Sequence, residues 1–297
     1  MSEKRELVFK AFNNEKTDRV PVGFWFHYTP NELLSAYEHP EYRDLNINGH
    51  KNFVKSFKPD FVKLMSDGYF FEPETAKIIG KAKKAADLRK LEPIAANDKW
   101  IKDQVSLVKK LTAFIKEDKE AVIYALSVIA HNTAILAHEV IKSGKADGIY
   151  LSVQTIQDLS VGPDLYSEVI APTELAVLAS ANAAGGKNIL HICGYEGAKN
   201  NLSLFKNYPA KVINFASVVE GVSLKKGKAL FGGKAVIGGF ENTKKGLLYK
   251  GTKEEIQAET KRLLKEAGKT GIILGADCTV PKDINFERFE WVREAAK

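Results

Sequence analysis

The sequence predicts an α/β fold, a (β/α)8 TIM barrel, built as a single domain over residues 1–297. The chain length of 297 residues suits such a barrel, which typically needs about 250 residues with insertions common. Short β-rich runs alternate along the chain with longer segments of helical periodicity. Most of these runs are continuously apolar or β-branched, as in AVIYALSV and GIILGADC, which is typical of parallel strands covered by helices. No low-complexity linker divides the chain.

Eight such runs supply the expected strands. They are Val20–Tyr28, Asp60–Ser66, Ala121–Val128, Asp147–Gln154, Asn188–Gly194, Lys211–Ser217, Ala235–Phe240 and Gly271–Cys278. Eight strands alternating with helices favour a closed barrel over an open, doubly wound sheet.

The segment Lys253–Ala267 shows the clearest helical pattern. One stripe is formed by Ile256, Thr260, Leu263 and Leu264, and charged residues occupy the other side. Thr252 and Glu255 have the spacing of a capping box, and Gly268 is a suitable C-cap. We therefore expect a surface helix with both ends fixed by its own sequence.

The glycines of GKALFGGKAVIGGF do not have the G-x-G-x-x-G spacing of a phosphate-binding loop. We interpret Gly232 and Gly233 as a turn, and Gly238 and Gly239 as close packing at a strand end.

Composition narrows the functional class. No stretch approaches the roughly 18 consecutive apolar residues of a membrane span, and the start of the chain lacks a secretory apolar region, so we expect a cytoplasmic protein without a membrane partner. The net charge is +7 and the isoelectric point is about 9.1. The basic runs lack the interleaved aromatic residues of a single-strand platform, so we interpret them as solvated surface and expect no nucleic-acid partner. The positive charge could steer anionic small ligands.

Three residues with soft donor atoms predict a metal site. His191 and Cys193 lie on one side of the expected strand Asn188–Gly194, and Cys278 ends the strand Gly271–Cys278. In a barrel the carboxyl ends of the strands meet on the active-site face, so we expect the three residues to meet there. Two thiolates and an imidazole suit zinc, and three protein ligands leave one position open, as in catalytic sites. The alternative is that both cysteines are small core residues and His191 is a hydrogen-bonded histidine.

Other polar and aromatic side chains are expected near the same face. Asp67 follows the second strand and could orient substrate or support a ligand; its alternative role is a helix N-cap. Further candidates could line a flat pocket for a macrocycle or pack beneath the rim; they are Trp25, His27, Tyr28, Tyr150 and Gln154. Asp277 should point away from its neighbour Cys278, so we interpret it as structural, and we interpret His131 and His138 as ordinary helix residues.

Two segments give the chain a family resemblance. RELVFKAFNNEKTDRVPV resembles the opening helix and the D-R-x-P-V strand entry of the uroporphyrinogen decarboxylase superfamily, and GGFENTKKGLLYKGTKEEIQAETKRLL resembles its late N-x-x-x-x-L-L-x-G-T-x-E-E-I segment. The resemblance extends over nearly the whole chain and implies a (β/α)8 barrel.

The superfamily has a cobamide-dependent methyltransferase branch, which includes methylcobamide:coenzyme M methyltransferase. This branch holds zinc with an H-x-C pair and a distant cysteine, which match His191, Cys193 and Cys278. The resemblance implies a small thiol substrate and a corrinoid such as methylcobalamin, delivered by a separate corrinoid protein. These relatives carry an acidic residue near the sequence position that corresponds to Glu220. The resemblance therefore also implies that Glu220 could fill the fourth zinc position; the alternative is a surface or helix-start carboxylate.

The decarboxylase branch matches less well. It binds its polyanionic tetrapyrrole partly through arginines of an R-Q-A-G-R segment, whereas this chain has GFWFHYTPNELLSAY there. Its catalytic aspartate matches Asp67, but its N-L-G-H-G segment is replaced by ILGADC. The sequence thus favours a zinc methyltransferase and leaves three alternatives: a metal-free uroporphyrinogen decarboxylase using Asp67, a related zinc lyase or demethylase, and a non-catalytic binding protein.

Overall fold

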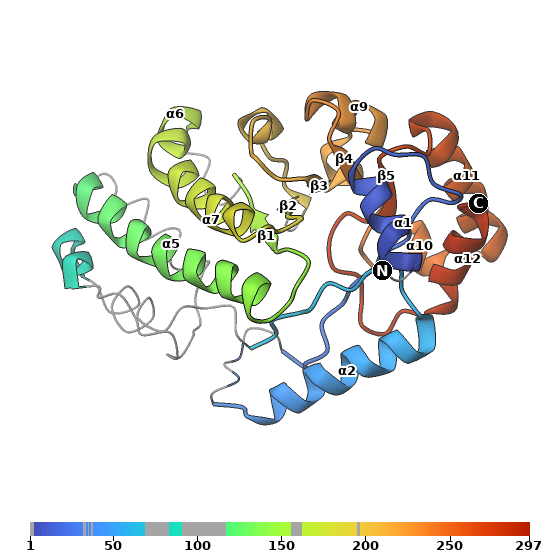
Figure 1. Ribbon diagram of the computed structural model, residues 1–297, viewed down its shortest axis with the longest axis horizontal. Coiled ribbons are helices and arrows are strands. Elements are labelled where there is room, and N and C mark those ends of the chain that lie inside the picture. Colours follow the sequence, from blue (N-terminus) through green and yellow to red (C-terminus); the bar gives the residue numbers. More distant parts are fainter. Residues whose placement is uncertain are drawn as a thin grey trace.

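The core of the protein is a five-stranded parallel β-sheet with its strands in the order β1-β2-β3-β4-β5 (Figure 1). The computed structural model describes residues 3–31, 34, 36, 38–68, 83–90, 117–155, 162–194 and 197–297. The strands are β1 (Tyr150–Val153), β2 (Ile189–Ile192), β3 (Val212–Phe215), β4 (Ala235–Phe240) and β5 (Ile272–Ala276). Their register aligns Ser152, His191 and Asn214 in one row across the sheet. The α/β class and the parallel sheet agree with the prediction.

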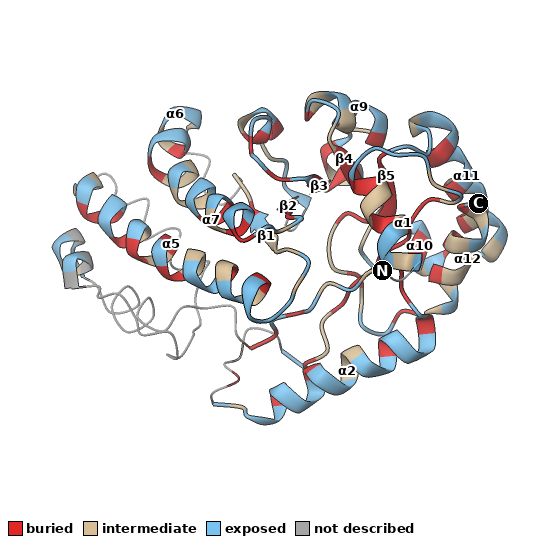
Figure 2. Ribbon diagram, in the orientation of Figure 1, coloured by how far each residue is buried: buried red, intermediate tan, exposed pale blue. Residues whose placement is uncertain are grey.

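Helices form an arc around the strands (Figure 1). The α-helices are α1 (Glu3–Phe12), α2 (Glu41–Phe57), α5 (Lys119–Lys142), α6 (Pro163–Leu165), α7 (Ala171–Ala183), α8 (Ser217–Glu220), α9 (Leu224–Leu230), α10 (Leu247–Lys250), α11 (Lys253–Ala267) and α12 (Glu287–Ala295). Short 3-10 helices span Ala85–Lys90 and Leu202–Phe205, and a π-helical turn spans Tyr166–Ile170. Buried side chains line the strands and the inner sides of the helices, and the outward sides are exposed (Figure 2).

The two faces of the sheet bury different sets of side chains, because successive residues of a strand point to opposite sides. Leu190, Ile213 and Phe215 pack outward with side chains of the covering helices, including Leu263 of α11. The inner-face cluster instead contains Ile189, Val212, Ala235, Ile237 and Ile273 together with Trp25, Met65 and side chains of α1. His191 alternates with the first set and shares the side of Ile189, so it faces inward.

The prediction of a strand at Ala121–Val128 is wrong. These residues belong to the 24-residue helix α5, in which the Asp118 side chain accepts a hydrogen bond from the Ala121 amide as the N-cap. A continuous apolar run does not distinguish a strand from a buried helix by periodicity. By length and composition α5 could also cross a membrane, but this is weak evidence, since core helices pass the same test and α5 packs against α7.

Two other expected strands are not formed in the described part of the chain. Within Val20–Tyr28 only Val22 makes a bridge, to Leu274 of β5, and Asp60–Ser66 is extended without strand pairing. The other five expected strands are present; β4 has the predicted bounds, and the other four are shorter than predicted. The bridge nevertheless places the 20–28 segment beside β5, as a sixth position around the sheet.

Helix α11 confirms the prediction for Lys253–Ala267. The Thr252 hydroxyl accepts from the Glu255 amide and the Glu255 carboxylate accepts from the Thr252 amide, which completes the capping box. Gly268 has φ of 77° and caps the other end. Gly239 lets α11 approach β4, because a Cβ atom there would lie 2.9 Å from Leu263 Cδ1 and φ is 113°.

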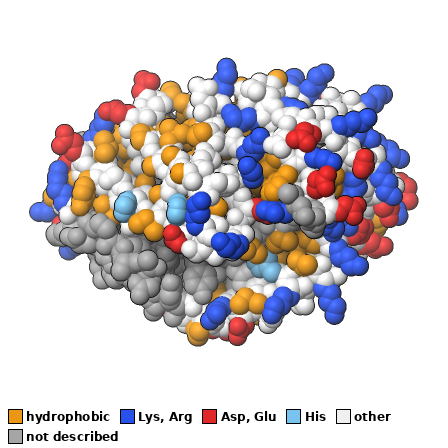
Figure 3. All heavy atoms as spheres, viewed as in Figure 1, with side chains coloured by type: hydrophobic (Ala, Val, Ile, Leu, Met, Phe, Trp, Pro, Cys, Tyr) orange, Lys and Arg blue, Asp and Glu red, His pale blue; other side chains and the backbone are white. Residues whose placement is uncertain are grey.

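Surface charge is dispersed. Lys and Arg side chains are spread over the face seen in Figure 3, mixed with acidic side chains and apolar atoms. This arrangement on the visible face agrees with the interpretation of the basic residues as solvated surface.

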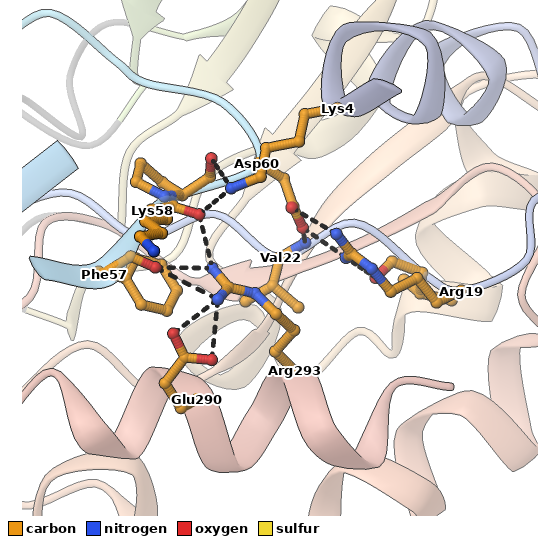
Figure 4. A network of polar contacts seen from close by, with 10 residues as sticks. Lys4, Arg19, Val22, Phe57, Lys58, Asp60, Glu290 and Arg293 are labelled. Carbon is orange, nitrogen blue, oxygen red and sulfur yellow. Dashed lines mark hydrogen bonds and ion pairs between the residues drawn. The ribbon is translucent and has the colours of Figure 1, made fainter. Parts of the chain in front are cut away.

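A buried ion pair anchors the start of the 20–28 segment (Figure 4). The Arg19 guanidinium donates to both carboxylate oxygens of Asp60 at 2.7 and 2.6 Å, and the Val22 amide donates to the same carboxylate at 2.9 Å. The Asp60 side chain is fully buried. Burial by itself raises the pKa of Asp60, but the hydrogen bonds from Arg19 and Val22 lower it below its usual value. The arginine of the D-R-x-P-V segment therefore holds the 20–28 segment to the start of the 60–66 segment.

The C-terminal end of α2 lies beside this pair (Figure 4). Helix ends leave carbonyl groups without intrahelical partners. Arg293 of α12 donates to the carbonyls of Phe57 and Lys58 at 3.2 and 3.1 Å, and Lys4 of α1 donates to that of Pro59 at 3.1 Å. Three helices are thereby joined at one point.

We predict that Asp60→Asn lowers the free energy of unfolding by about 3–5 kcal/mol, because Arg19 loses its buried partner. The contribution of Asp60 is present above its unfolded-state pKa and is lost as the pH falls through its lower folded-state pKa. The difference between variant and wild type should therefore be largest near neutral pH and shrink in acid. Thermal unfolding between pH 7 and pH 3 measures it.

The exposed pair Lys244–Asp283 provides the matched control. Asp283→Asn should have little effect on stability at any pH, since exposed pairs contribute little. Equal effects of the two substitutions would show that the buried pair has no special role.

Candidate metal centre

The three predicted ligands come together at the carboxyl ends of two strands. His191 lies in β2, Cys193 follows it by two residues, and Cys278 follows β5 by two residues. One donor atom from each side chain lies within 4.8 Å of the other two. The sulfurs of Cys193 and Cys278 are 3.9 Å apart, and both cysteines are free. Two sulfurs bound to one tetrahedral zinc at 2.3 Å would lie about 3.8 Å apart, so the spacing fits shared coordination.

The environment of His191 also fits a metal ligand. The side chain is buried, with 2% exposure, and neither ring nitrogen has a hydrogen-bond partner among the described residues. A buried polar atom without a partner costs free energy, which coordination would offset. Among the common biological cations, zinc is well suited to a donor set of one imidazole and two thiols.

The surroundings of Cys278 favour its deprotonation. The Cys193 thiol lowers the pKa of Cys278 well below its usual value, against the opposing effect of burial, and His191 lowers it further. A thiolate is the form that binds a metal. The alternative, that the cysteines and His191 are ordinary core residues, does not account for three donors converging with two imidazole nitrogens unpaired.

Tyr150 and Asn214 fix the ring of His191. The Tyr150 ring stacks on the His191 ring, with centroids 5.1 Å apart and planes inclined by 27°. The Tyr150 hydroxyl donates to Asn214 Oδ1 at 2.5 Å, and the Asn214 amide donates to the Ile237 carbonyl at 3.0 Å. The imidazole plane is thus set by packing from β1 and by a buried polar residue of β3. Tyr150 is the first residue of β1, so it lies at the amino end of this strand and not at its carboxyl end.

Asn200 joins the loops that follow β1, β2 and β3. Its side chain accepts from the Thr155 amide at 2.7 Å and donates to the Cys193 carbonyl at 2.8 Å and to Glu220 Oε1 at 3.0 Å. Its backbone amide donates to the same Glu220 oxygen at 2.9 Å. Glu220, at the end of α8, is buried and lies outside the three-residue cluster. Glu220 is therefore positioned by Asn200, and its catalytic role stays a prediction.

Asp67 is fully buried and accepts hydrogen bonds from the 27–29 segment. His27 Nδ1 lies 2.9 Å from Oδ1, and the amides of Tyr28 and Thr29 donate to Oδ2 at 2.7 and 3.3 Å. Burial would raise the pKa of Asp67, but these hydrogen bonds lower it below its usual value. Asp67 thus joins the end of the 60–66 segment to the end of the 20–28 segment, and none of these hydrogen bonds makes it an N-cap of a described helix.

The remaining predicted residues are distributed around the inner face. Trp25 is buried and packs edge-on against Tyr150 at 5.3 Å, whereas Tyr28 packs against His50 and Phe26. Gln154 follows β1, and its buried Oε1 has no partner among the described residues. Substrate contacts by these residues stay predictions.

Asp277 has the structural role expected of it. It accepts from the Ser217 hydroxyl at 2.9 Å and from the Val218 amide at 2.8 Å at the start of α8. Burial raises its pKa to about 6.

Sequence reasoning missed three residues near the centre: Asn200, Asn214 and Lys63. Asn214 and Lys63 interrupt apolar β-rich runs, in VINF and FVKLM, and a polar residue at such a position was a usable signal. Asn200 lies in a polar stretch and gave none.

Comparison with known proteins agrees with the fold. The profile of the family described as uroporphyrinogen decarboxylase (URO-D) matches residues 103–297, so the chain belongs to the uroporphyrinogen decarboxylase family. No curated protein sequence matches it. The solved structure of a methyltransferase from Methanosarcina mazei is similar over 99% of this chain and 98% of its own, with a TM-score of 0.61 and 17% sequence identity. At that identity the likeness concerns the fold.

We predict about one zinc ion per chain in purified wild-type protein, and its loss in both Cys193→Ser and Cys278→Ser. A serine hydroxyl stays protonated near neutral pH and is a poor zinc ligand, whereas the apolar core does not depend on the metal. Elemental analysis and thermal unfolding, measured on the same samples, should show lost zinc with little change in fold.

His138→Gln is the control, because His138 lies on the outer helix α5 and pairs with Glu139. It should keep its zinc. Cysteine variants that retain zinc but lose about 1–3 kcal/mol of unfolding free energy would behave as packing substitutions that bury an unsatisfied hydroxyl. That result would disprove the metal centre.

Proposed function

We propose that this protein is a zinc-dependent methyltransferase that moves a methyl group between a corrinoid and a small thiol. The observation that carries the proposal is the convergence of His191, Cys193 and Cys278, with both nitrogens of the buried histidine unpaired among the described residues. When bound, zinc would supply an open position whose positive charge lowers the pKa of a thiol, so that a thiolate nucleophile exists at neutral pH.

The reaction is a displacement. The thiolate sulfur forms a bond to the methyl carbon while the cobalt–carbon bond breaks, and the electron pair of that bond stays on the corrinoid. No external oxidant or reductant is required. The chain would contribute positioning, which is a large part of the rate acceleration when two reactants must be aligned.

The curvature of the sheet supports a closed (β/α)8 barrel as the scaffold, formed by residues 1–297 as one domain. In a flat sheet β2 and β5 would be about 14 Å apart, at about 4.8 Å per strand interval. Cys193 follows β2 and Cys278 follows β5, yet their sulfur atoms are only 3.9 Å apart. Strands that curve around a common interior, as in a barrel, would account for this spacing.

Residues around the cluster have distinct proposed roles. Tyr150 keeps the His191 ring in place, and Asn200 keeps the Cys193 loop and Glu220 in register. Asp67 holds His27 and Tyr28 at the mouth, where with Trp25 and Gln154 they would border the corrinoid. Asp67 and Glu220 would orient substrate.

A uroporphyrinogen decarboxylase is the second candidate, favoured by the family and by the buried, ionised Asp67 at a segment end. It is opposed by the 23–37 segment GFWFHYTPNELLSAY, which contains no arginine to neutralise a polycarboxylate. A related zinc lyase would keep the metal and change the substrate. For the methyltransferase we propose a cytoplasmic location and a separate corrinoid protein as partner, with neither a nucleic acid nor a membrane.

We expect the zinc-loaded protein to demethylate methylcobalamin in the presence of small thiols, with one thioether formed per corrinoid demethylated. Visible absorption follows the corrinoid and mass spectrometry identifies the product. Cys278→Ser should fall to the background rate because it lacks the metal, and Asp283→Asn should retain full activity.

Uroporphyrinogen separates the two candidates. We expect little loss of substrate carboxylates, with or without zinc. Rapid decarboxylation by the metal-free protein, combined with no transfer to any thiol tested, would reject the methyltransferase in favour of the second candidate.

A further inference from the structure

A lysine that the proposed chemistry does not use lies beside the metal centre. Lys63 belongs to the 60–66 segment, and its ammonium nitrogen lies 4.0 Å from the centroid of the Tyr150 ring and 5.5 Å from that of Trp25. The Tyr150 ring stacks in turn on His191. Trp25 belongs to the inner-face cluster and Tyr150 borders it, so the ammonium group lies on the same side of the sheet as His191.

The ammonium group has no carboxylate of its own. Lys63 forms no ion pair in the part of the chain that the structure describes. Asp67 is the nearby acidic side chain, but its two oxygens are taken by His27 and by the amides of Tyr28 and Thr29. An interior cation without a partner is costly and is usually compensated by an anion. Among the described residues, the rings of Tyr150 and Trp25 are direct contacts that offset part of this cost.

The side chains whose negative charge acts most strongly on Lys63 are the two cysteines of the metal centre. Burial lowers the pKa of Lys63 to about 8, and Cys278, Cys193 and Asp67 act in the opposite direction, in that order. A divalent zinc ion would cancel the charges of the two thiolates. Lys63 would then face a neutral centre until a fourth ligand arrived.

The charge balance changes with that ligand. A neutral ligand leaves one uncompensated positive charge at Lys63, whereas an anionic ligand is balanced by it. We infer that Lys63 is a specificity-determining residue that favours an anionic fourth ligand, such as the thiolate sulfur of the acceptor, over a neutral one. The inference rests on the proposed metal centre, and it assigns the effect to the charge on the donor atom and not to an acidic group elsewhere on the ligand.

Cobalt(II) in place of zinc makes ligand binding visible by absorption without any turnover. We would measure dissociation constants at one fixed pH for azide, 2-mercaptoethanol, 3-mercaptopropionate and the neutral ligand imidazole. The proteins are wild type, Lys63→Met, Lys63→Gln and Lys63→Arg, with Lys55→Met as the control on the exposed face of α2. Metal content and melting temperature identify any variant that fails to fold, and the two neutral substitutions serve as replacements for each other.

The expected result is a loss of about tenfold or more in affinity for azide and for both thiols in Lys63→Met or Lys63→Gln. Imidazole binding should be unchanged, and Lys63→Arg should retain most of the affinity for anions. Lys55→Met should match wild type.

Three results would overturn the inference. They are unchanged affinity for anions, an equal loss for imidazole and azide, and a loss confined to 3-mercaptopropionate, which would show that Lys63 contacts the acidic tail. The azide measurement separates this inference from the proposed function. If azide depends on Lys63 while neither thiol binds even wild type, the charge selection stands and the thiol methyltransferase does not.

Discussion

The parallel register of the sheet is the constraint on which the rest of the structure depends. Parallel strands have their carboxyl ends on the same side of the sheet. In a curved sheet, residues that follow strands far apart in the sequence can meet in one interior. β2 and β5 are separated by two strands, yet Cys193 and Cys278 meet with sulfurs 3.9 Å apart. A shift of β2 by one residue would turn His191 toward the covering helices and disperse the donor set.

Polar residues in the interior hold this arrangement in place. Asn214 accepts a hydrogen bond from the Tyr150 hydroxyl, and Asp67 joins the 20–28 and 60–66 segments. Asn200 joins residues that follow β1 and β2 to the end of α8. Asn214 and Asp67 are buried and Asn200 is partly buried, and the hydrogen bonds of each cross between elements, so each fixes one element relative to another as well as satisfying its own polar atoms. At the opposite end of the 60–66 segment, the Arg19–Asp60 pair holds the same segments together. The 20–28 and 60–66 segments are therefore joined at both of their ends.

The sequence predicted the features that depend on local pattern. The capping box of α11, the C-cap at Gly268 and five of the strands follow from spacing and composition, and the structure has them. Ala121–Val128 was misassigned because an apolar run fits a buried strand and a buried helix equally well, and only packing against α7 distinguishes them. The segments Val20–Tyr28 and Asp60–Ser66 are extended as expected, but pairing depends on neighbours that periodicity does not reveal.

For the candidate site, too, the sequence predicted the residues that a local pattern marks and missed the contacts between elements. The three soft donors could be found because strand-end placement makes distant residues neighbours. Lys63 could be noticed as a polar residue within an apolar run, but its contacts with the aromatic rings could not be predicted, and Asn200 gave no signal, because contacts between loops and with ring faces are not encoded in residue spacing.

X-ray absorption at the zinc edge tests the central claim most directly, because it reports the atoms bound to the metal without requiring turnover. The account predicts two sulfur ligands at about 2.3 Å and one imidazole nitrogen at about 2.0 Å, together with one light atom in the open position. Saturation with 2-mercaptoethanol should replace that light atom and raise the count to three sulfurs. A zinc ion bound only by nitrogen and oxygen, or a sulfur count that stays at two with thiol in excess, would contradict it.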